Sequence, residues 1–166
     1  MLAYISIQKG EIDLIVLAPP EQVEGAQCET VSETQAIEIV RELSDEMKEF
    51  LQQNQGKGLA GPQIGKNLKF FMMATSDGEY KIFFNSKYYG TASRTQSGES
   101  CLTYGKDRYY RVKRYKAIQA HYQELIDDKL VPVKVNVRGF DAIAFQHETD
   151  HLYGDTIVMK GDPIKN

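Results

Sequence analysis

Apolar side chains recur at helical spacing in one long segment near the start of the chain, residues 31–58. Ser32 followed by Gln35 can form a capping box, in which each side chain bonds the backbone N–H of the other residue. Gly56 and Gly58 interrupt the pattern at its far end, because glycine disfavours a helix interior. The segment therefore predicts one long helix that begins after Ser32 and stops before the glycines. Its apolar positions, three, four or seven apart, are Ile37, Val40, Met47, Phe50 and Leu51.

From Leu68 onward the pattern changes to short runs of apolar, β-branched and aromatic residues, separated by Asp-Gly, Ser-Gly and Asp-Asp turns. Such runs predict strands in an antiparallel arrangement. Pro132 has no backbone N–H to give to a neighbouring strand, so the last strand is expected at a sheet edge or with a break. The predicted strands are residues 68–74, 80–84, 108–123 and 130–137.

A second helical pattern follows Gly139 and runs through residues 140–153, and only 12 residues remain after Gly154. A helix, several strands and a second helix together predict an α+β fold. The 166 residues, 42% of them hydrophobic, are enough for one domain with its own core and too few for two ordinary domains. We therefore predict a single domain over residues 1–166.

Charge and targeting signals limit the kinds of partner and the cellular location that we expect. The net charge of −3 comes from 20 basic and 23 acidic residues spread along the chain, which disfavours binding to nucleic acid or to an anionic membrane. The densest basic run, residues 111–116, is predicted to be the solvated face of a strand. No segment has the ~18 uninterrupted apolar residues of a membrane helix, and Glu11 and Asp13 interrupt the first apolar run, unlike a signal peptide. Cys28 and Cys101 make a poor disulfide framework, so we predict a soluble protein of the cytoplasm.

The stretch FQHETDHLYG at residues 145–154 contains an H-E-x-x-H pattern. On a helix His147 and His151 lie on one face, so both imidazoles can reach one metal ion. Glu148 lies about 100° further round the helix, where its carboxylate can take a proton from a coordinated water instead of binding the metal. The alternative is a pair of histidines that are solvated or hydrogen-bonded near a helix end. Because the spacing is specific, we favour the metal site.

A catalytic site of this kind needs a third protein ligand. The extended peptidase pattern fails, because Ile157 stands where its last histidine is required and no glutamate follows Glu148. Asp155 or Asp162 would reach the site only by an awkward return of the chain, so the ligand is expected upstream. Cys101, between turn-forming residues, is the natural candidate. By itself a free cysteine is more often a small buried hydrophobe, but an incomplete H-E-x-x-H helix favours its use as a ligand.

Three motifs resemble those of peptide deformylases, which carry G-x-G-x-A-A-x-Q, E-G-C-L-S and Q-H-E-x-D-H in this order. The chain has GKGLAGPQ at 56–63, ESCLT at 99–103 and QHETDH at 146–151, and Arg108 matches an arginine usual in that family. The resemblance covers residues 32–160. It implies antiparallel sheets packed around a central metal-binding helix.

The resemblance also implies an activity, the hydrolytic removal of the formyl group from N-formylmethionyl peptides of nascent proteins, with release of formate. Cys101, His147 and His151 would hold one divalent metal ion, natively Fe²⁺, with Zn²⁺, Ni²⁺ or Co²⁺ able to occupy the same site. Glu148 would be the general base. The implied partner is the N-formylmethionyl peptide, met at the ribosome, and the implied oligomeric state is a monomer.

The same resemblance implies which groups stabilise the negative charge on the formyl oxygen. The side-chain amide of Gln63 and the backbone N–H of Leu102 would donate hydrogen bonds to it. Without the resemblance, Gln63 would be a surface polar residue after a helix and loop. Gly58 would let the backbone approach the substrate closely, and the alternative for it is a turn after the first helix.

Substrate-binding residues are expected on the metal-binding helix. Three apolar residues lie seven, four and three positions before His147 and share its face: Phe140, Ile143 and Ala144. They predict an apolar wall that suits a methionine side chain, although ordinary core residues would show the same spacing.

Two departures from the family motifs concern the same pocket. Lys57 stands where the family has an apolar pocket residue; its stem can leave the wall intact with the ammonium turned outward, or the lysine can alter substrate preference. Ser100 replaces a glycine beside the cysteine. The predicted substrate-binding set is Lys57, Gly58, Ser100, Arg108, Phe140, Ile143 and Ala144.

Three hypotheses remain open at this point. The chain is an active deformylase, or a metallo-amidase or peptidase that uses the same Cys-His-His site on another acyl or peptide substrate, or a metal-stabilised binding protein without activity. Glu148 and Gln63 weigh against the third, because a purely structural metal site needs neither.

Overall fold

Two antiparallel sheets and four helices make up residues 15–165, the part of the chain that the computed structural model describes. Within these residues no helix is long and apolar enough to cross a membrane. The prediction that the first apolar run is not a signal peptide rests on Glu11 and Asp13, which lie outside this range. The helices are α1 (Pro20–Val23), α2 (Glu33–Asn54), α3 (Gly139–Leu152) and α4 (Ile157–Lys160). Two 3-10 turns, η1 (Gly61–Ile64) and η2 (Leu102–Tyr104), follow β1 and β4.

The larger sheet has five strands in the order β1 (Gly58–Ala60), β2 (Phe70–Ala74), β3 (Tyr80–Gly90), β6 (Ala117–Ile126) and β7 (Lys129–Arg138). The smaller sheet has the order β4 (Arg94–Cys101), β5 (Gly105–Tyr115) and β8 (Gly161–Pro163). All neighbouring strands pair antiparallel. The predicted α+β fold with antiparallel sheets is confirmed.

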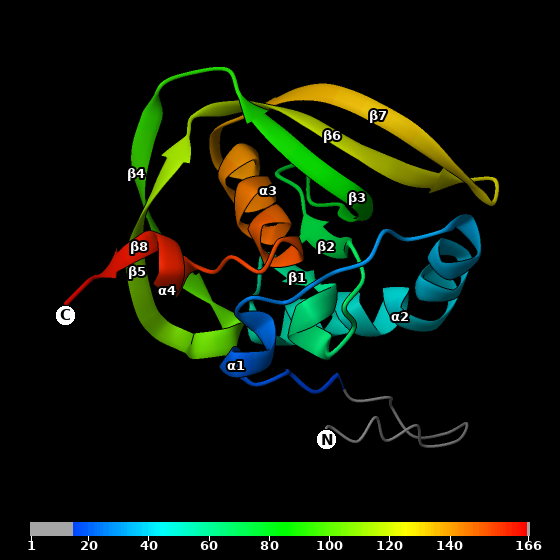
Figure 1. Ribbon diagram of the computed structural model, residues 1–166, viewed down its shortest axis with the longest axis horizontal. Helices are drawn as coiled ribbons and strands as arrows, with labels where there is room; N and C mark the ends of the chain where they lie inside the picture. The colour runs from blue at the N-terminus through cyan, green and yellow to red at the C-terminus, as the bar shows by residue number, and fades with distance from the viewer. Residues whose placement is uncertain (1–14, 166) are drawn as a thin grey trace.

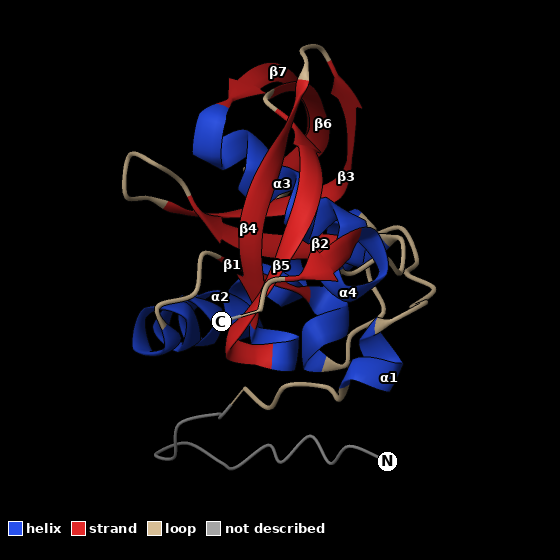
Figure 2. Ribbon diagram, turned by 90° about the vertical axis from the view of Figure 1, so that its left-hand side faces the viewer, coloured by secondary structure: helices blue, strands red, loops and turns tan. Residues whose placement is uncertain are grey.

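The helix that carries the H-E-x-x-H pattern lies in the middle of the molecule. The larger sheet curves over α3, and β4 and β5 lie at its side (Figures 1 and 2). Every side chain from Ala144 to Leu152 is buried, so the polar residues of the pattern lie in the interior. Buried polar and charged groups are stable only with partners, and this requirement shapes the site described below.

The strand β2 shows how the larger sheet is buried on both faces. Side chains alternate along a strand, so Phe70 and Met72 join the core beneath α2, whereas Phe71 and Met73 join the core around α3. A continuous apolar run is therefore required here, in place of the apolar and polar alternation of a half-exposed strand.

The long helix is confirmed as α2, with its capping box in place. The hydroxyl of Ser32 accepts from the Gln35 backbone N–H at 3.2 Å, and the Gln35 side chain accepts from the Ser32 N–H at 2.9 Å. The helix ends at Asn54, and its C-cap is Gln55, whose φ of 52° is left-handed, one residue before the glycine expected to stop the helix.

The strand predictions need correction at one predicted strand and at three strands that were not predicted, β1, β4 and β8. Residues 108–123 were expected as one strand, but the chain turns at Lys116, and β5 and β6 belong to different sheets. The strand β4 was not predicted, because its sequence RTQSGESC is polar and lacks the apolar pattern of a strand. The expectation for Pro132 is confirmed, since β7 is the edge strand of the larger sheet.

Candidate metal centre

Cys101, His147 and His151 come together at the junction of the two sheets. The sulfur and the ring nitrogens that can bind a metal lie within 4.8 Å of one another, and Sγ of Cys101 is 3.5 Å from Nε2 of His151. Ligands held tetrahedrally at about 2.0 to 2.3 Å from an ion such as zinc are themselves about 3.5 Å apart. The cluster therefore fits one divalent metal ion.

Glu148 lies beside this cluster and not within it. Its Oε1 is 4.0 Å from Nε2 of His147, and its Oε2 is buried with no hydrogen-bond partner among residues 15–165. A Cβ at Gly58 would stand 2.5 Å from both Cδ and Oε1 of Glu148, which is closer than van der Waals contact. The missing side chain at Gly58 thus makes room for the Glu148 carboxylate, a role that the sequence did not reveal.

Replacing Gly58 by alanine is expected to displace the Glu148 carboxylate. A shift of about 1 Å in a reacting group can cost about 100-fold in rate, so the turnover of Gly58→Ala is expected to fall by that order while the metal stays bound. Steady-state rates together with metal content measure this. Unchanged turnover would contradict the contact.

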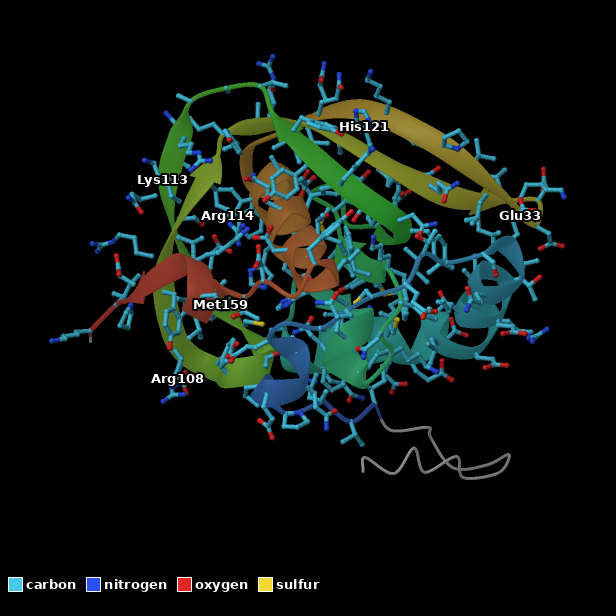
Figure 3. The ribbon with its side chains drawn as sticks, viewed as in Figure 1. Glu33, Arg108, Lys113, Arg114, His121 and Met159 are labelled. Atoms are coloured by element: carbon cyan, nitrogen blue, oxygen red, sulfur yellow. The ribbon has the colours of Figure 1, made fainter. Side chains whose placement is uncertain are left out.

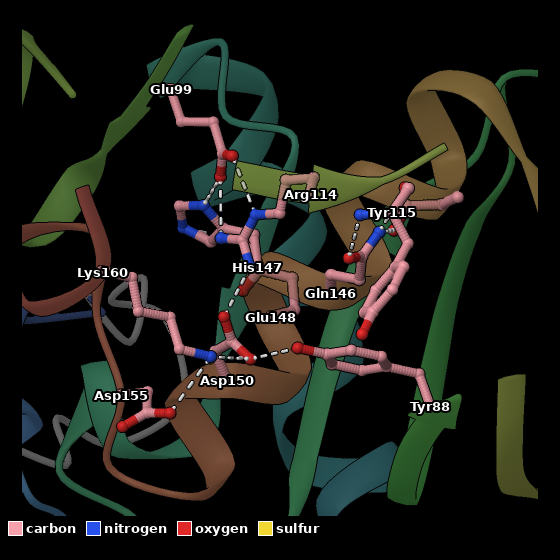
Figure 4. A network of polar contacts seen from close by, with 11 residues as sticks. Tyr88, Glu99, Arg114, Tyr115, Gln146, His147, Glu148, Asp150, Asp155 and Lys160 are labelled. Atoms are coloured by element: carbon pink, nitrogen blue, oxygen red, sulfur yellow. Dashed lines mark hydrogen bonds and ion pairs between the residues drawn. The ribbon is translucent and has the colours of Figure 1, made fainter. Parts of the chain in front are cut away.

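Glu99 holds His147 in place. Its Oε1 is 2.8 Å from Nδ1 of His147, and its two oxygens accept from Nε and Nη2 of Arg114 at 2.9 and 3.0 Å (Figure 4). Arg114 also donates to Asp150 at 2.5 Å, and Asp150 in turn accepts from the hydroxyl of Tyr88 at 2.8 Å. This buried network orients the imidazole of His147, as the second ring nitrogen of a metal-binding histidine requires.

The basic run 111–116 was predicted to be solvated, and for Arg114 this is wrong, since the residue is 2% exposed. The strand alternation carries the missed signal. Val112 and Arg114 face inward, whereas Arg111 and Lys113 are exposed. An arginine on the same face as a buried valine requires buried carboxylates opposite it, which Glu99 and Asp150 supply.

The contacts around the cluster set its ionisation. Burial raises the pKa of the Glu99 carboxyl, but hydrogen bonds from His147 and Arg114 outweigh burial and lower the pKa to about 2. Burial likewise opposes ionisation of Cys101, yet the charge of His151 and hydrogen bonds to both histidines hold the thiol pKa well below its usual value. Burial raises the pKa of Glu148, and His147 and His151 oppose this effect. These contacts favour the thiolate of Cys101, the form that binds metals.

Arg114→Met is expected to lower the free energy of unfolding by about 3 kcal/mol, because it leaves Glu99 and Asp150 as buried charges without their shared cation. Urea unfolding measures the loss. The matched control is Arg111→Met, which changes the exposed face of the same strand and is expected to stay within about 0.5 kcal/mol of the parent. Equal losses in the two variants would contradict the network.

Gln63 is fixed with its amide nitrogen toward the cluster. Its Oε1 accepts from the Ala60 backbone N–H at 2.9 Å, and its Nε2 donates to Thr103 Oγ1 at 3.1 Å and to Cys101 Sγ at 3.4 Å. The side chain is 1% exposed. The surface alternative for Gln63 is therefore wrong, and a preorganised donor lies beside the cluster.

A cavity of about 360 Å³ opens onto this centre, within the ~300–1,000 Å³ of small-ligand pockets. Ile143 and Ala144 line its wall, whereas Phe140 is 63% exposed and lies at the rim. Arg108 is exposed and does not line the cavity (Figure 3); Lys106 and Tyr109 of the same strand do, and the sequence did not indicate them. The predicted residues that line it are Lys57, Gly58, Gln63, Ser100, Cys101, Leu102, Phe140, Ile143, Ala144, His147 and Glu148.

A cluster of one thiolate and two imidazoles, with a buried carboxylate beside it at the base of a cavity, is the arrangement of a metal-dependent hydrolase. Residues 14–166 match the sequence model of the polypeptide deformylase family. The peptide deformylase of Desulfotalea psychrophila is 33% identical over 131 residues, which cover 76% of this chain and 75% of the relative. Peptide deformylase 2 of Bacillus cereus is 31% identical over 156 residues, covering 89% of this chain and 83% of the relative. The chain therefore belongs to the polypeptide deformylase family.

Solved structures share the fold. The peptide deformylase of Synechococcus elongatus in complex with actinonin aligns with a TM-score of 0.78 at 24% identity, over 93% of this chain and 84% of that one. A Met-Ala-Ser-bound peptide deformylase from Acinetobacter baumannii aligns with a TM-score of 0.77 at 21% identity, over 90% of this chain and 99% of that one. At these identities the likeness supports the fold alone.

Proposed function

We propose that this deformylase acts on N-formylmethionyl peptides with Cys101, His147 and His151 as metal ligands and Glu148 as general base. The observation that carries the assignment is the buried Glu148 carboxylate, which lies 4.0 Å from His147 at the base of the cavity and outside the ligand cluster. A structural metal site has no use for such a group.

When bound, the divalent ion supplies a water nucleophile at neutral pH and polarises the formyl carbonyl. Glu148 accepts a proton from the attacking water and passes it to the departing amine, as the C–N bond of the formamide breaks. The products are formate and a free amino terminus. The amide of Gln63 stays held by Ala60 and Thr103, and its second N–H turns from Cys101 Sγ to the formyl oxygen as negative charge develops there, together with the backbone N–H of Leu102.

The methionine side chain is proposed to lie against Ile143 and Ala144, with Phe140 at the rim and Lys57, Gly58 and Ser100 along the cavity. A wall of this kind favours an unbranched apolar side chain over a charged one. Arg108 is left out of the proposed set, because it lies outside the cavity. The Met-Ala-Ser named in the Acinetobacter baumannii structure is a product of this reaction, and formyl-Met-Ala-Ser is the corresponding substrate.

The native ion is proposed to be Fe²⁺, with Zn²⁺, Ni²⁺ or Co²⁺ as competent replacements, since thiolate and imidazole ligands suit all four. The family resemblance further supports a single catalytic domain over residues 1–166. It also supports a monomer that meets nascent peptides at the ribosome, in the cytoplasm. Metal analysis after anaerobic purification tests the ion, and sedimentation tests the oligomeric state.

Rates on formylated, acetylated and unmodified methionyl peptides test the function. We expect rapid turnover of formyl-Met-Ala-Ser and little of the other two, because an acetyl group adds a methyl where the formyl hydrogen meets the cavity base. Faster turnover of the acetylated peptide or of an internal amide would replace deformylation by another amidase activity. A protein with one bound metal ion and no turnover of any of the three peptides would support the hypothesis of a metal-stabilised binding protein without activity.

A further inference from the structure

The mouth of the cavity carries aromatic and cationic side chains. Phe140 is 63% exposed and Tyr109 is 46% exposed, and both line the cavity. Each comes with a lysine that also lines it, Lys57 near Phe140 and Lys106 on the same strand as Tyr109. Exposed apolar rings at the mouth of a pocket mark a surface for a ligand.

The charge of Lys57 is already balanced. Its Nζ lies 3.4 Å from Oδ1 of Asp141 and 5.0 Å from the centre of the Phe140 ring. Asp141 is fixed in turn, because its Oδ2 accepts from the backbone N–H and the hydroxyl of Ser76. The lysine stem thus completes the cavity wall while the ammonium is neutralised by a carboxylate at the rim.

Lys106 differs in having no such partner. It is exposed on β5, and among residues 15–165 no ion pair or hydrogen bond joins its side chain to another group. The carboxylates that line the cavity do not offset it, because Glu99 is paired with Arg114 and Glu148 is buried at the base. The next residue, Asp107, does not line the cavity. The mouth therefore carries one uncompensated positive charge.

In the proposed function the formyl group of the peptide meets Glu148 at the base of the cavity. The residues after the methionine then pass the mouth, where Tyr109, Phe140 and Lys106 are exposed. A carboxylate a few ångströms from an unpaired ammonium is attracted even in a solvated setting, and a second ammonium is repelled.

We infer that this deformylase prefers peptides with acidic residues directly after the formylmethionine, and that Lys106 determines this preference. The inference rests on the proposed function. It adds a residue that acts on substrate choice and leaves the chemistry at Glu148 unchanged.

The test compares kcat/KM for three peptides, formyl-Met-Glu-Glu-Ser, formyl-Met-Gln-Gln-Ser and formyl-Met-Lys-Lys-Ser. At low salt we expect the acidic peptide to exceed the basic one by roughly two- to fivefold, the range for an exposed ion pair. The difference is expected in KM and is expected to shrink as ionic strength rises. Lys106→Met abolishes the preference and Lys106→Glu reverses it. The matched control is Lys113→Met, an exposed lysine of the same strand outside the cavity, which keeps it (Figure 3).

Equal kcat/KM values for the acidic and basic peptides, or a preference that survives Lys106→Met, overturn the inference and leave deformylation intact. The absence of turnover on all three peptides, the neutral one included, overturns the proposed function and the inference with it.

Discussion

Glu148→Gln is expected to keep its metal, and its kcat is expected to fall by a factor of about 10² to 10⁴, the usual contribution of a general base. The amide matches the carboxylate in shape, so the close contact with Gly58 is preserved, and none of the three ligand side chains changes. What the variant lacks is an acceptor for the proton of the attacking water and a donor for the departing amine.

Metal content and kcat on formyl-Met-Ala-Ser, measured under anaerobic conditions, separate the two effects. Glu38→Gln makes the same chemical change at an exposed position of α2 and is the control. A Glu148→Gln protein that lost its metal would assign Glu148 to the ligand set. One with full turnover would remove it from the mechanism.

Cys101→Ala is expected to lose both metal and activity. The thiolate is one of three ligand atoms within 4.8 Å of one another, and two imidazoles on one helix bind a divalent ion far more weakly than a complete set. Cys28→Ala is the matched control, since Cys28 is a half-buried free cysteine outside the cluster. Full metal occupancy in Cys101→Ala, or metal loss in Cys28→Ala, would contradict the assignment.

The parts of the fold that the sequence predicted are those with local causes. The capping box of α2 joins Ser32 and Gln35, and the edge position of β7 follows from the missing N–H of Pro132. The H-E-x-x-H spacing likewise places His147 and His151 on one helix face without reference to the rest of the chain.

The parts that were missed depend on pairing between distant segments. β4 is polar and becomes a strand only because β5 lies beside it, and the turn at Lys116 is defined by two different sheets. The burial of Arg114 depends on carboxylates 15 and 36 residues away. The close approach of Gly58 to Glu148 joins two segments that are far apart in the sequence, so no local pattern predicts it.

The position of Cys101 has a consequence for assembly. Cys101 ends a strand of the smaller sheet, its partner His151 lies 50 residues later on a helix packed mainly on the larger sheet, and their ligand atoms meet only when both halves have docked. A metal ion that binds only the docked form stabilises that form by mass action, and the stabilisation grows with the logarithm of the free concentration of the ion. The temperature at which the protein unfolds therefore depends on the free concentration of the metal ion. When the ion is scarce, the junction of the two sheets is destabilised before either sheet is.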